Sequence, residues 1–395
     1  MEVRLGVGIS SFIGFPSLQH FSNWIGWIAL LATVPPAIIS MLVLFPVRKH
    51  AIRLSLLDEP SGHSTHLRAT PLGGGIGIWL GIITTFLVGT GAVVAFRQSP
   101  ELTEKLPESL IPYLEGAWSR MGQIWGLIAS ATILFVLGLR DDQRGVSPYV
   151  RLAVEFVVAA FVVYGLNFRL TAYIGFPWLT GWLSVIWIVG VINSFNMLDN
   201  MDGLSGGVAA IIAAAMAVVM LTTPDPGTTQ PQIFVAILLL ITFGSIAGFL
   251  FHNRPPAKIF MGDAGSYLVG FLIAVSMLMA TYAGNESKPH AVLAPLCAMA
   301  VPLYDMTTVL WIRLKEGRSL FVGDRSHFSH RLVELGLSRT QAVLTIHLVT
   351  VTCGLAAILM THVSIYQAAM VLGIVACMLF LIIILESTGW RKDSE

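Results

Sequence analysis

Eleven stretches of about 20 mostly apolar residues run through this chain of 395 residues, and they constrain its fold more than any other feature. A helix of about 20 apolar residues crosses the hydrocarbon core of a bilayer. Only 11% of the residues are charged and 55% are hydrophobic, whereas an average soluble domain is about 25% charged. This composition excludes an ordinary soluble enzyme, a disordered chain and a nucleic-acid-binding protein with a basic face. The stretches lie near residues 24–45, 73–96, 119–139, 150–167, 180–196, 204–222, 232–252, 265–283, 290–312, 341–361 and 365–386.

The apolar pattern predicts an all-α integral membrane protein, a polytopic bundle of about eleven transmembrane helices. Of the 23 Lys and Arg residues, 17 fall on one side of the predicted spans. The positive-inside rule makes that side cytoplasmic, which puts the N-terminus outside and the C-terminus in the cytoplasm. Neither a repeat nor a soluble domain interrupts the pattern, so residues 1–395 are expected to form a single transmembrane domain. Its predicted cytoplasmic loops are 46–72, 140–151, 193–204, 252–266 and 313–340.

Seven aspartates gather in these cytoplasmic loops. An Asp near a membrane span is costly, by about 3 kcal/mol at the centre of a helix and less toward the interface. Seven of them on one face therefore require a shared reason. They are Asp58, Asp141, Asp142, Asp199, Asp202, Asp263 and Asp324.

The adjacent pair Asp141 and Asp142 follows directly on an apolar run. Two neighbouring carboxylates repel each other unless a divalent cation, nearby basic groups or a shared proton relieves the repulsion. The alternative is a solvated helix C-terminus with Arg140 and Arg144 as counterions, although helix C-termini disfavour anions.

A second polar group repeats at intervals of three residues: Asn193, Asn196, Asp199 and Asp202. If the segment is helical, these residues form a polar stripe at the end of a span. Hard oxygen ligands of this kind suit Mg²⁺, and an Asp can also bind a ribose or the edge of a base.

Two further segments are rich in turn residues and polar groups. Asp263 follows a turn with prolines and glycines, and capping of the next helix would by itself explain it. The loop with Asp324 and Arg325 also carries His327 and His330, a combination that suits phosphate binding. The two histidines could also form a zinc pair, but the neighbouring oxygen ligands favour Mg²⁺ or Mn²⁺. Ser338 and Gln341 form a capping-box pattern before the tenth apolar run.

Five motifs, in the order in which they occur, resemble those of the bacterial polyprenyl-phosphate N-acetylhexosamine-1-phosphate transferases. These integral membrane enzymes start lipid-linked glycan assembly, and the resemblance covers residues 56–341. The motifs are Asp58-x-Pro60 with His66 and Pro71-x-Gly-Gly, the pair Asp141-Asp142, the series Asn193, Asn196, Asp199 and Asp202, the segment Phe260-Met-Gly-Asp263-x-Gly-Ser266, and Asp324-Arg325-x-His327-x-x-His330. Pro302-x-x-Asp305 and Arg313 also fit the approach to the last motif.

The resemblance implies a reaction in which polyprenyl phosphate attacks the β-phosphate of a UDP-N-acetylhexosamine and UMP leaves. Phosphoryl transfer depends mostly on positioning and charge neutralisation, and Mg²⁺ (or Mn²⁺) bound to the diphosphate would stabilise the leaving group. The implied partners are the UDP-sugar, the polyprenyl phosphate and the lipid bilayer, without nucleic acid, and a homodimer stays open. The implied location is the inner (plasma) membrane, with the active site of this single catalytic domain facing the cytoplasm.

The resemblance also assigns roles to residues. Asp263 and Asn196 match metal ligands, and Asp141 and Asp142 match an essential pair that acts beside the metal or as a base. Catalytic roles are further implied for Arg151, His327 and His330, and substrate-binding roles for Asn193, Asp199, Asp202, Asn253, Phe260 and Arg325.

The chain departs from the family pattern at a few positions. Relatives usually carry Arg-Lys at His63-Ser64, a His at Ser329 and often a Lys at Arg151, which puts lipid-phosphate or sugar contacts in question. The last motif resembles the branch that initiates O-antigen, teichoic-acid or exopolysaccharide chains, so GlcNAc 1-phosphate and undecaprenyl phosphate are the leading expectation. The alternatives are the peptidoglycan-precursor transferase that uses UDP-MurNAc-pentapeptide and, in a different class, a membrane transporter whose polar residues line a path.

Overall fold

Long apolar helices make up most of the protein. The computed structural model describes residues 23–58, 69–170, 175–225, 230–280, 282, 288–321, 323 and 325–392. Within these residues, ten helices are long and apolar enough to cross a membrane, or eleven if one bent pair counts as a span, which confirms the predicted bundle. The longer helices are α2 (Asn23–His50), α3 (Gly74–Gln98), α6 (Met121–Arg144), α7 (Pro148–Ala160), α8 (Pro177–Leu198), α9 (Leu204–Thr222), α10 (Ile233–Asn253), α11 (Gly262–Met279), α13 (Ala300–Lys315), α15 (Arg339–Met360) and α16 (Ile365–Lys392). The shorter elements are α4 (Pro100–Thr103), η2 (Glu108–Leu110), α5 (Ile111–Ser119), η3 (Phe161–Gly165), η4 (Pro289–Leu293), α12 (Ala294–Ala298), α14 (Phe328–Glu334), β1 (Leu57–Asp58) and β2 (Thr70–Pro71).

The ninth predicted span is a bent pair of helices. Residues Pro289–Ala298 and Ala300–Lys315 meet at 65°, so the run near 290–312 is broken rather than straight. Pro289 and Pro295 each stand in the first turn of a short helix, where a missing N–H is tolerated. The start of α15 agrees with the sequence, because Ser338 and Gln341 form the expected capping box.

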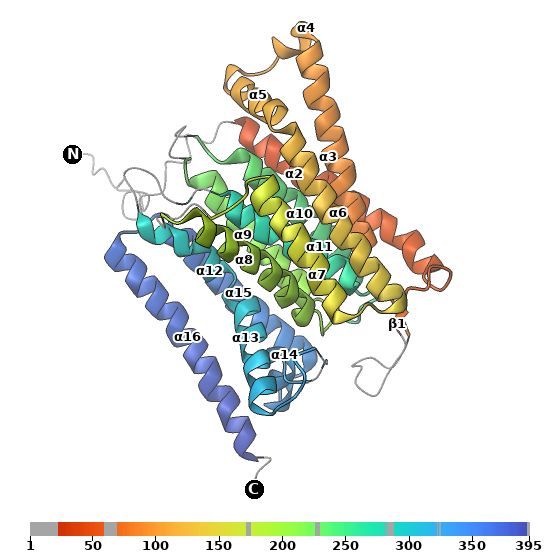
Figure 1. Cartoon of the computed structure of the whole chain (residues 1–395), viewed down its shortest axis with the longest axis vertical. Coiled ribbons are helices and arrows are strands. Elements are labelled where there is room, and N and C mark those ends of the chain that lie inside the picture. Colours follow the sequence, from red (N-terminus) through yellow and green to blue (C-terminus); the bar gives the residue numbers. More distant parts are fainter. Residues whose placement is uncertain are drawn as a thin grey trace, which may run out of the picture.

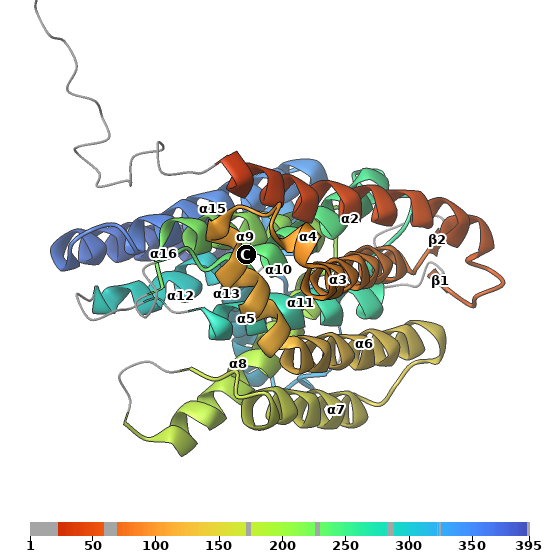
Figure 2. The ribbon, with the colours of Figure 1, turned by 90° about the horizontal axis from the view of Figure 1, so that it is seen from above.

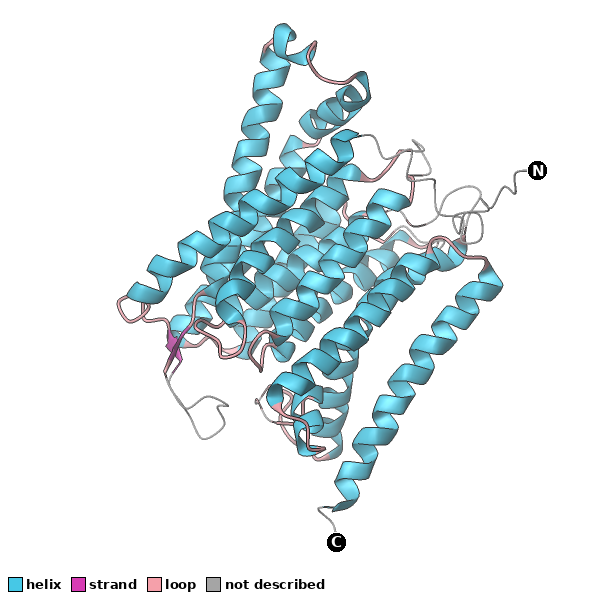
Figure 3. Cartoon of the chain, turned by 180° about the vertical axis from the view of Figure 1, so that it is seen from behind, coloured by secondary structure: helices cyan, strands magenta, loops and turns pink. Residues whose placement is uncertain are grey.

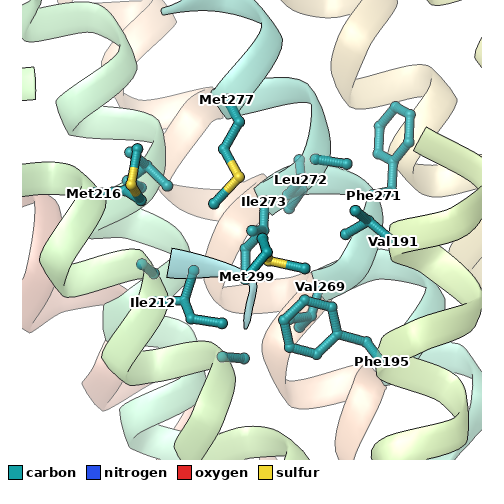
Figure 4. Close-up of a cluster of buried hydrophobic side chains, with 14 of the residues drawn as sticks. Val191, Phe195, Ile212, Met216, Val269, Phe271, Leu272, Ile273, Met277 and Met299 are labelled. Atoms are coloured by element: carbon teal, nitrogen blue, oxygen red, sulfur yellow. The ribbon is translucent and has the colours of Figure 1, made fainter. Parts of the chain in front are cut away.

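Helix α11 occupies the centre of the bundle (Figures 1 and 2). Of its most apolar segment of 18 residues, 89% is buried, and α11 contacts α3, α6, α8, α9 and α10. Figure 4 shows its side chains Val269 and Phe271 beside Val191 and Phe195 of α8. Burial of large apolar side chains fixes the position of α11, and with it the residues at its N-terminus.

Helix α16 lies along one edge of the bundle, beside α15 (Figure 1). Only 17% of its most apolar segment is buried, as expected for a helix with most of its surface toward lipid. At the far end of the bundle, α4 lies at the tip of α3, and α5 lies beside the same end of α3, above the start of α6 (Figure 1).

The loops that carry the polar motifs gather at one end of the bundle, where β1 and β2 form a short antiparallel pair (Figure 3). Asp58 pairs there with Thr70. The next segment is hydrogen-bonded to residues 260–261: Phe260 N donates to Pro71 O, and Gly74 N donates to Phe260 O, both at 2.9 Å. Backbone hydrogen bonds therefore join the first motif to the fourth.

Candidate active site

The motif loops surround one cavity of about 680 Å³ at this end of the bundle. All but one of the predicted site residues line it. The lining includes Asp58, Asp141, Asp142, Arg151, Asn193, Asn196, Asp199, Asp202, Asn253, Phe260, Asp263, Arg313, His327 and His330. The exception is Arg325, which is exposed and does not line the cavity. Asp324, His63 and His66 lie outside the described residues.

Asp263 stands in the first turn of α11, so the expectation that it caps this helix is wrong. The residue at the N-cap is Met261, and Gly262 takes a φ of 72°, a conformation that favours glycine. The Asp263 carboxylate accepts a hydrogen bond from Asn196 Nδ2 at 2.5 Å. Its other oxygen, Oδ2, lies 3.9 Å from Arg151 Nη1. These contacts bring together the two residues that the family resemblance assigns to a metal.

The carboxylate of Asp142, from α6, supplies the cap that Asp263 does not. It accepts hydrogen bonds from Asp263 N at 2.8 Å and from Ala264 N at 3.1 Å. The first N–H groups of a helix have no partner within the helix, and the positive end of its dipole favours an anion. Asp142 thus fixes the start of α11, and the hypothesis of a solvated helix terminus is wrong for this residue.

Asp141 is held by groups from two other helices. Arg151 Nη1 donates to Asp141 Oδ2 at 2.8 Å, and Tyr267 Oη donates to the same oxygen at 3.0 Å. The backbone N–H of Val146 donates to Oδ1 at 2.7 Å. A basic group does pair with one of the two adjacent carboxylates, but it is Arg151 of α7 rather than Arg140 or Arg144.

The series of residues spaced by three is only partly helical. Helix α8 ends at Leu198, so Asn193 and Asn196 lie on its last turns, whereas Asp199 is at its C-cap and Asp202 lies in the following turn. The single helical stripe predicted from the spacing is therefore wrong beyond Asn196. All four side chains still reach the cavity because the chain turns at its edge.

The side chains of Asp202 and Asn253 form hydrogen bonds with backbone groups of neighbouring loops. Asp202 Oδ2 accepts from Ala257 N at 2.9 Å. Asn253 accepts from Gly203 N at 2.9 Å and donates to Ile259 O at 2.8 Å. The two side chains thus join the turn after α8 to the loop before α11, in addition to lining the cavity.

The last motif brings two histidines to the cavity. His327 Nδ1 lies 2.9 Å from Asp305 Oδ2 and donates to it, while Phe328 N donates to Asp305 Oδ1 at 2.6 Å. Burial, followed by the electrostatic effect of the neighbouring His327 and Arg325, lowers the pKa of His330 to about 4. His330 is therefore neutral at pH 7 and interacts through hydrogen bonds rather than as a cation.

Two polar residues of the site have no place in the sequence motifs. Glu155 is 1% exposed within α7 and accepts a hydrogen bond from Asn193 Nδ2 at 2.6 Å. Tyr267, on α11, donates to Asp141. An isolated Glu within an apolar run could have indicated Glu155, because such a carboxyl is costly in a membrane span. No pattern in the sequence sets Tyr267 apart from an ordinary core tyrosine.

The residues present fit Mg²⁺ better than zinc. Among the described residues, no three His, Cys, Asp or Glu side chains stand close enough to hold a metal ion together. Mg²⁺ does not need such a set, because it is usually bound by one or two carboxylates, waters and substrate phosphates. Asp263 and Asn196 supply a carboxylate and an amide oxygen, whereas Nδ1 of His327 is already bound to Asp305.

Asp199 is expected to make stability depend on pH. Burial, followed by the charge of Asp263, raises its pKa from 3.8 to about 7. The folded protein then binds this proton more tightly than the unfolded chain, so the stabilisation is complete below about pH 4 and is lost as the pH rises to about 7. We expect the Tm of the wild type to fall relative to that of Asp199→Asn between pH 5 and pH 8. Parallel Tm profiles of the two proteins in a fluorescence melt would contradict this assignment.

Gly138 is expected to be indispensable for the contact between α6 and α11. A Cβ at this position would lie 2.4 Å from Ala264 N and from the carbonyl group of Asp263. Because backbone cannot move aside like a side chain, Gly138→Ala should destabilise the protein by about 1–3 kcal/mol and lower activity. Gly122→Ala on the same helix is the matched control, since among described residues no heavy atom lies within 4 Å of its Cβ position. Equal Tm and activity in the two variants would show that the close contact is unimportant.

Bundle and site together define a multi-pass membrane protein with an acidic cavity at one end. The sequence matches the model of glycosyl transferase family 4 over residues 124–281. The chain is 31% identical over 317 residues to the undecaprenyl-phosphate alpha-N-acetylglucosaminyl 1-phosphate transferase of Yersinia pestis, and the match covers 78% of each chain. The chain belongs to glycosyl transferase family 4.

Two other relatives match over a similar or greater length. The probable undecaprenyl-phosphate N-acetylglucosaminyl 1-phosphate transferase of Bacillus subtilis (strain 168) is 29% identical over 364 residues, 89% of this chain and 90% of the relative. The decaprenyl-phosphate N-acetylglucosaminephosphotransferase of Mycobacterium tuberculosis is 30% identical over 339 residues, 80% of this chain and 79% of the relative. These similarities favour neither the transporter nor the peptidoglycan-precursor alternative.

Proposed function

We propose that the protein transfers N-acetylglucosamine 1-phosphate from UDP-GlcNAc to a polyprenyl phosphate, with undecaprenyl phosphate as the leading lipid, and releases UMP. The observation that carries this proposal is the convergence of five separate sequence motifs on a single cavity. The names of the three relatives, which specify an N-acetylglucosaminyl phosphate group and a polyprenyl phosphate, support it. The transfer would initiate a lipid-linked polysaccharide of the cell envelope.

The proposed reaction exchanges one phosphoanhydride bond for another. An oxygen of the lipid phosphate forms a bond to the β-phosphorus of UDP-GlcNAc, and the bond from that phosphorus to the bridging oxygen breaks, so that UMP leaves. The lipid phosphate is already mostly ionised near neutral pH, because its second pKa is about 6, and it needs no strong base. Positioning and charge neutralisation are then the main tasks of the protein.

Different residues of the cavity would carry out the positioning and the charge neutralisation. Asp263 and Asn196 would hold Mg²⁺, which when bound neutralises diphosphate charge and stabilises the leaving UMP. Asp142 fixes the backbone of Asp263, and Arg151, 3.9 Å from Asp263 and paired with Asp141, adds positive charge beside the anionic substrates. His327 and His330 line the cavity as hydrogen-bonding groups for the diphosphate.

We place the cavity on the cytoplasmic face of the inner (plasma) membrane. The positive-inside rule supports this orientation, since the loops around the cavity carry most of the Lys and Arg residues. UDP-sugars are water-soluble, whereas a polyprenyl phosphate stays in the bilayer, so a cavity at the end of the bundle can receive both. Phe260, which lines the cavity, is a candidate for stacking on the uracil ring.

A screen of UDP-sugars tests the proposed function. Purified protein, Mg²⁺ and one polyprenyl phosphate are combined with UDP-GlcNAc, UDP-GalNAc, UDP-glucose or UDP-MurNAc-pentapeptide, and UMP is measured. We expect rapid release from UDP-GlcNAc only when the lipid phosphate is present, and none when EDTA removes the metal. No lipid-dependent UMP release from any UDP-N-acetylhexosamine would overturn the proposal.

A further inference from the structure

Glu386 is a buried carboxylate on α16, a helix most of whose residues are not buried in the bundle. It lies near the end of α16 and is 9% exposed, whereas Leu381 and Ile383 on the same helix are 56% and 43% exposed. A carboxyl in a membrane span is costly unless other groups satisfy it, and it usually faces the interior of the bundle. The position of Glu386 therefore requires specific partners.

Two partners come from the elements beside the cavity. Tyr304 Oη, on α13, donates a hydrogen bond to Glu386 Oε2 at 2.7 Å. Arg331 Nε, on α14, forms an ion pair with Glu386 Oε1 at 3.0 Å. Since α16 contacts mainly α15 and the short α14, Glu386 links a peripheral helix to the segment that carries the last motif.

The partners of Glu386 contact the residues on both sides of His327. Arg331 Nη1 donates to the carbonyl oxygen of Ser326, and its Nη2 donates to Thr308 Oγ1 at 3.0 Å. On the other side, the rings of Tyr304 and Phe328 pack edge to face with centroids 5.4 Å apart. Movement of either partner would shift the residue before or after His327.

The same segment is fixed from the cavity side by Asp305, the residue after Tyr304. Asp305 is fully buried and accepts hydrogen bonds from His327 Nδ1 and Phe328 N. The segment around His327 is thus held between Asp305 on one side and the groups paired with Glu386 on the other, and His330 follows in the same short helix α14. Glu386 itself does not line the cavity.

We propose that Glu386 is a positioning residue, which orients His327 and His330 toward the substrate diphosphate through Arg331 and Tyr304. The proposal rests on the proposed function insofar as these histidines act on a diphosphate. Misplacement of a reacting group by about 1 Å can lower a rate about 100-fold, so a residue outside the cavity can still govern turnover.

The test combines amide hydrogen exchange with turnover in Glu386→Ala, Glu386→Gln and Leu381→Ala. In Glu386→Ala we expect exchange of residues 325–334 to become at least about tenfold faster and kcat to fall about 10–100-fold, at little change in KM. Glu386→Gln should show an exchange rate and a kcat between those of the wild type and Glu386→Ala. It should fold even if the alanine variant does not, because its side-chain oxygen can still accept a hydrogen bond from Tyr304. Leu381→Ala, a lipid-facing change on the same helix, should match the wild type.

A double variant separates positioning from general stability. If Glu386 acts through His327, then adding Glu386→Ala to His327→Ala should lower kcat by less than about threefold further. If Glu386 has a purely structural role, the kcat loss of the double variant should equal the product of the losses in the two single variants. Unchanged exchange of residues 325–334 in both Glu386 variants, or fully multiplicative losses, would overturn the proposal. The exchange measurement needs no substrate, so a wild type that releases no UMP would refute the proposed function, while exchange would still decide whether Glu386 holds the segment.

Discussion

Replacing Asp263 by alanine is expected to lower the rate of UMP release by about 1,000-fold while leaving the protein folded. Loss of a group that stabilises transition-state charge costs several kcal/mol, and about 4 kcal/mol corresponds to this factor. Asp263 accepts a hydrogen bond from Asn196 but caps no helix, so its loss should shift the Tm only slightly. The measurement is UMP release with a melt of the same sample.

The matched control for this prediction is Asp225→Ala. Asp225 belongs to a loop that the sequence places on the opposite face of the membrane, and it lines a different cavity. This variant should retain wild-type turnover. Activity of Asp263→Ala within threefold of the wild type, over a range of Mg²⁺ concentrations, would remove Asp263 from the metal site.

Asp142→Ala should impair both stability and turnover, because two backbone N–H groups of α11 would lose their acceptor. Loss of a helix cap costs about 1–2 kcal/mol, and the accompanying displacement of Asp263 should lower kcat about 100-fold. Asp142→Asn keeps one oxygen that can accept from the helix end, so it should recover much of the Tm and part of the rate. Circular-dichroism melts and UMP release measure the two effects.

The two Asp142 variants also separate the roles left open by the family resemblance. If Asp142 acted as a base or as an essential metal ligand, Asp142→Asn would be as inactive as Asp142→Ala despite a normal Tm. That outcome would contradict a positioning role. Recovery of turnover together with Tm would instead show that the carboxylate works by holding the start of α11.

Most residues of the site were predictable from the sequence, whereas the role of each was not. Asp141 and Asp142 stand out as carboxylates at the end of an apolar run, and both reach the cavity. That Asp142 caps α11 depends on the close approach of α6 at Gly138, a contact between residues over 120 positions apart. Sequence spacing carries no information about such a contact.

Local backbone geometry explains the other differences. The period of three predicted a polar stripe for a segment that is helical throughout, but α8 ends at Leu198, and Asp199 takes a non-helical conformation. The ninth span is interrupted at Met299, between two helices. Their apolar residues form one continuous stretch in the sequence, which therefore predicts a single straight helix. Glu155 and Asn193 come from different helices, and their hydrogen bond depends on the packing of α7 against α8. The sequence alone does not indicate this packing.

The fate of the β-phosphate tests the central claim most directly. The protein is incubated with Mg²⁺, undecaprenyl phosphate and UDP-GlcNAc labelled with ³²P at the β-phosphate, and the lipid and aqueous products are separated. Transfer of GlcNAc 1-phosphate predicts that the label enters the lipid fraction in step with the release of unlabelled UMP. Label that stays in the aqueous phase as UDP, while GlcNAc appears on the lipid, would show transfer of the sugar alone and contradict the proposed reaction.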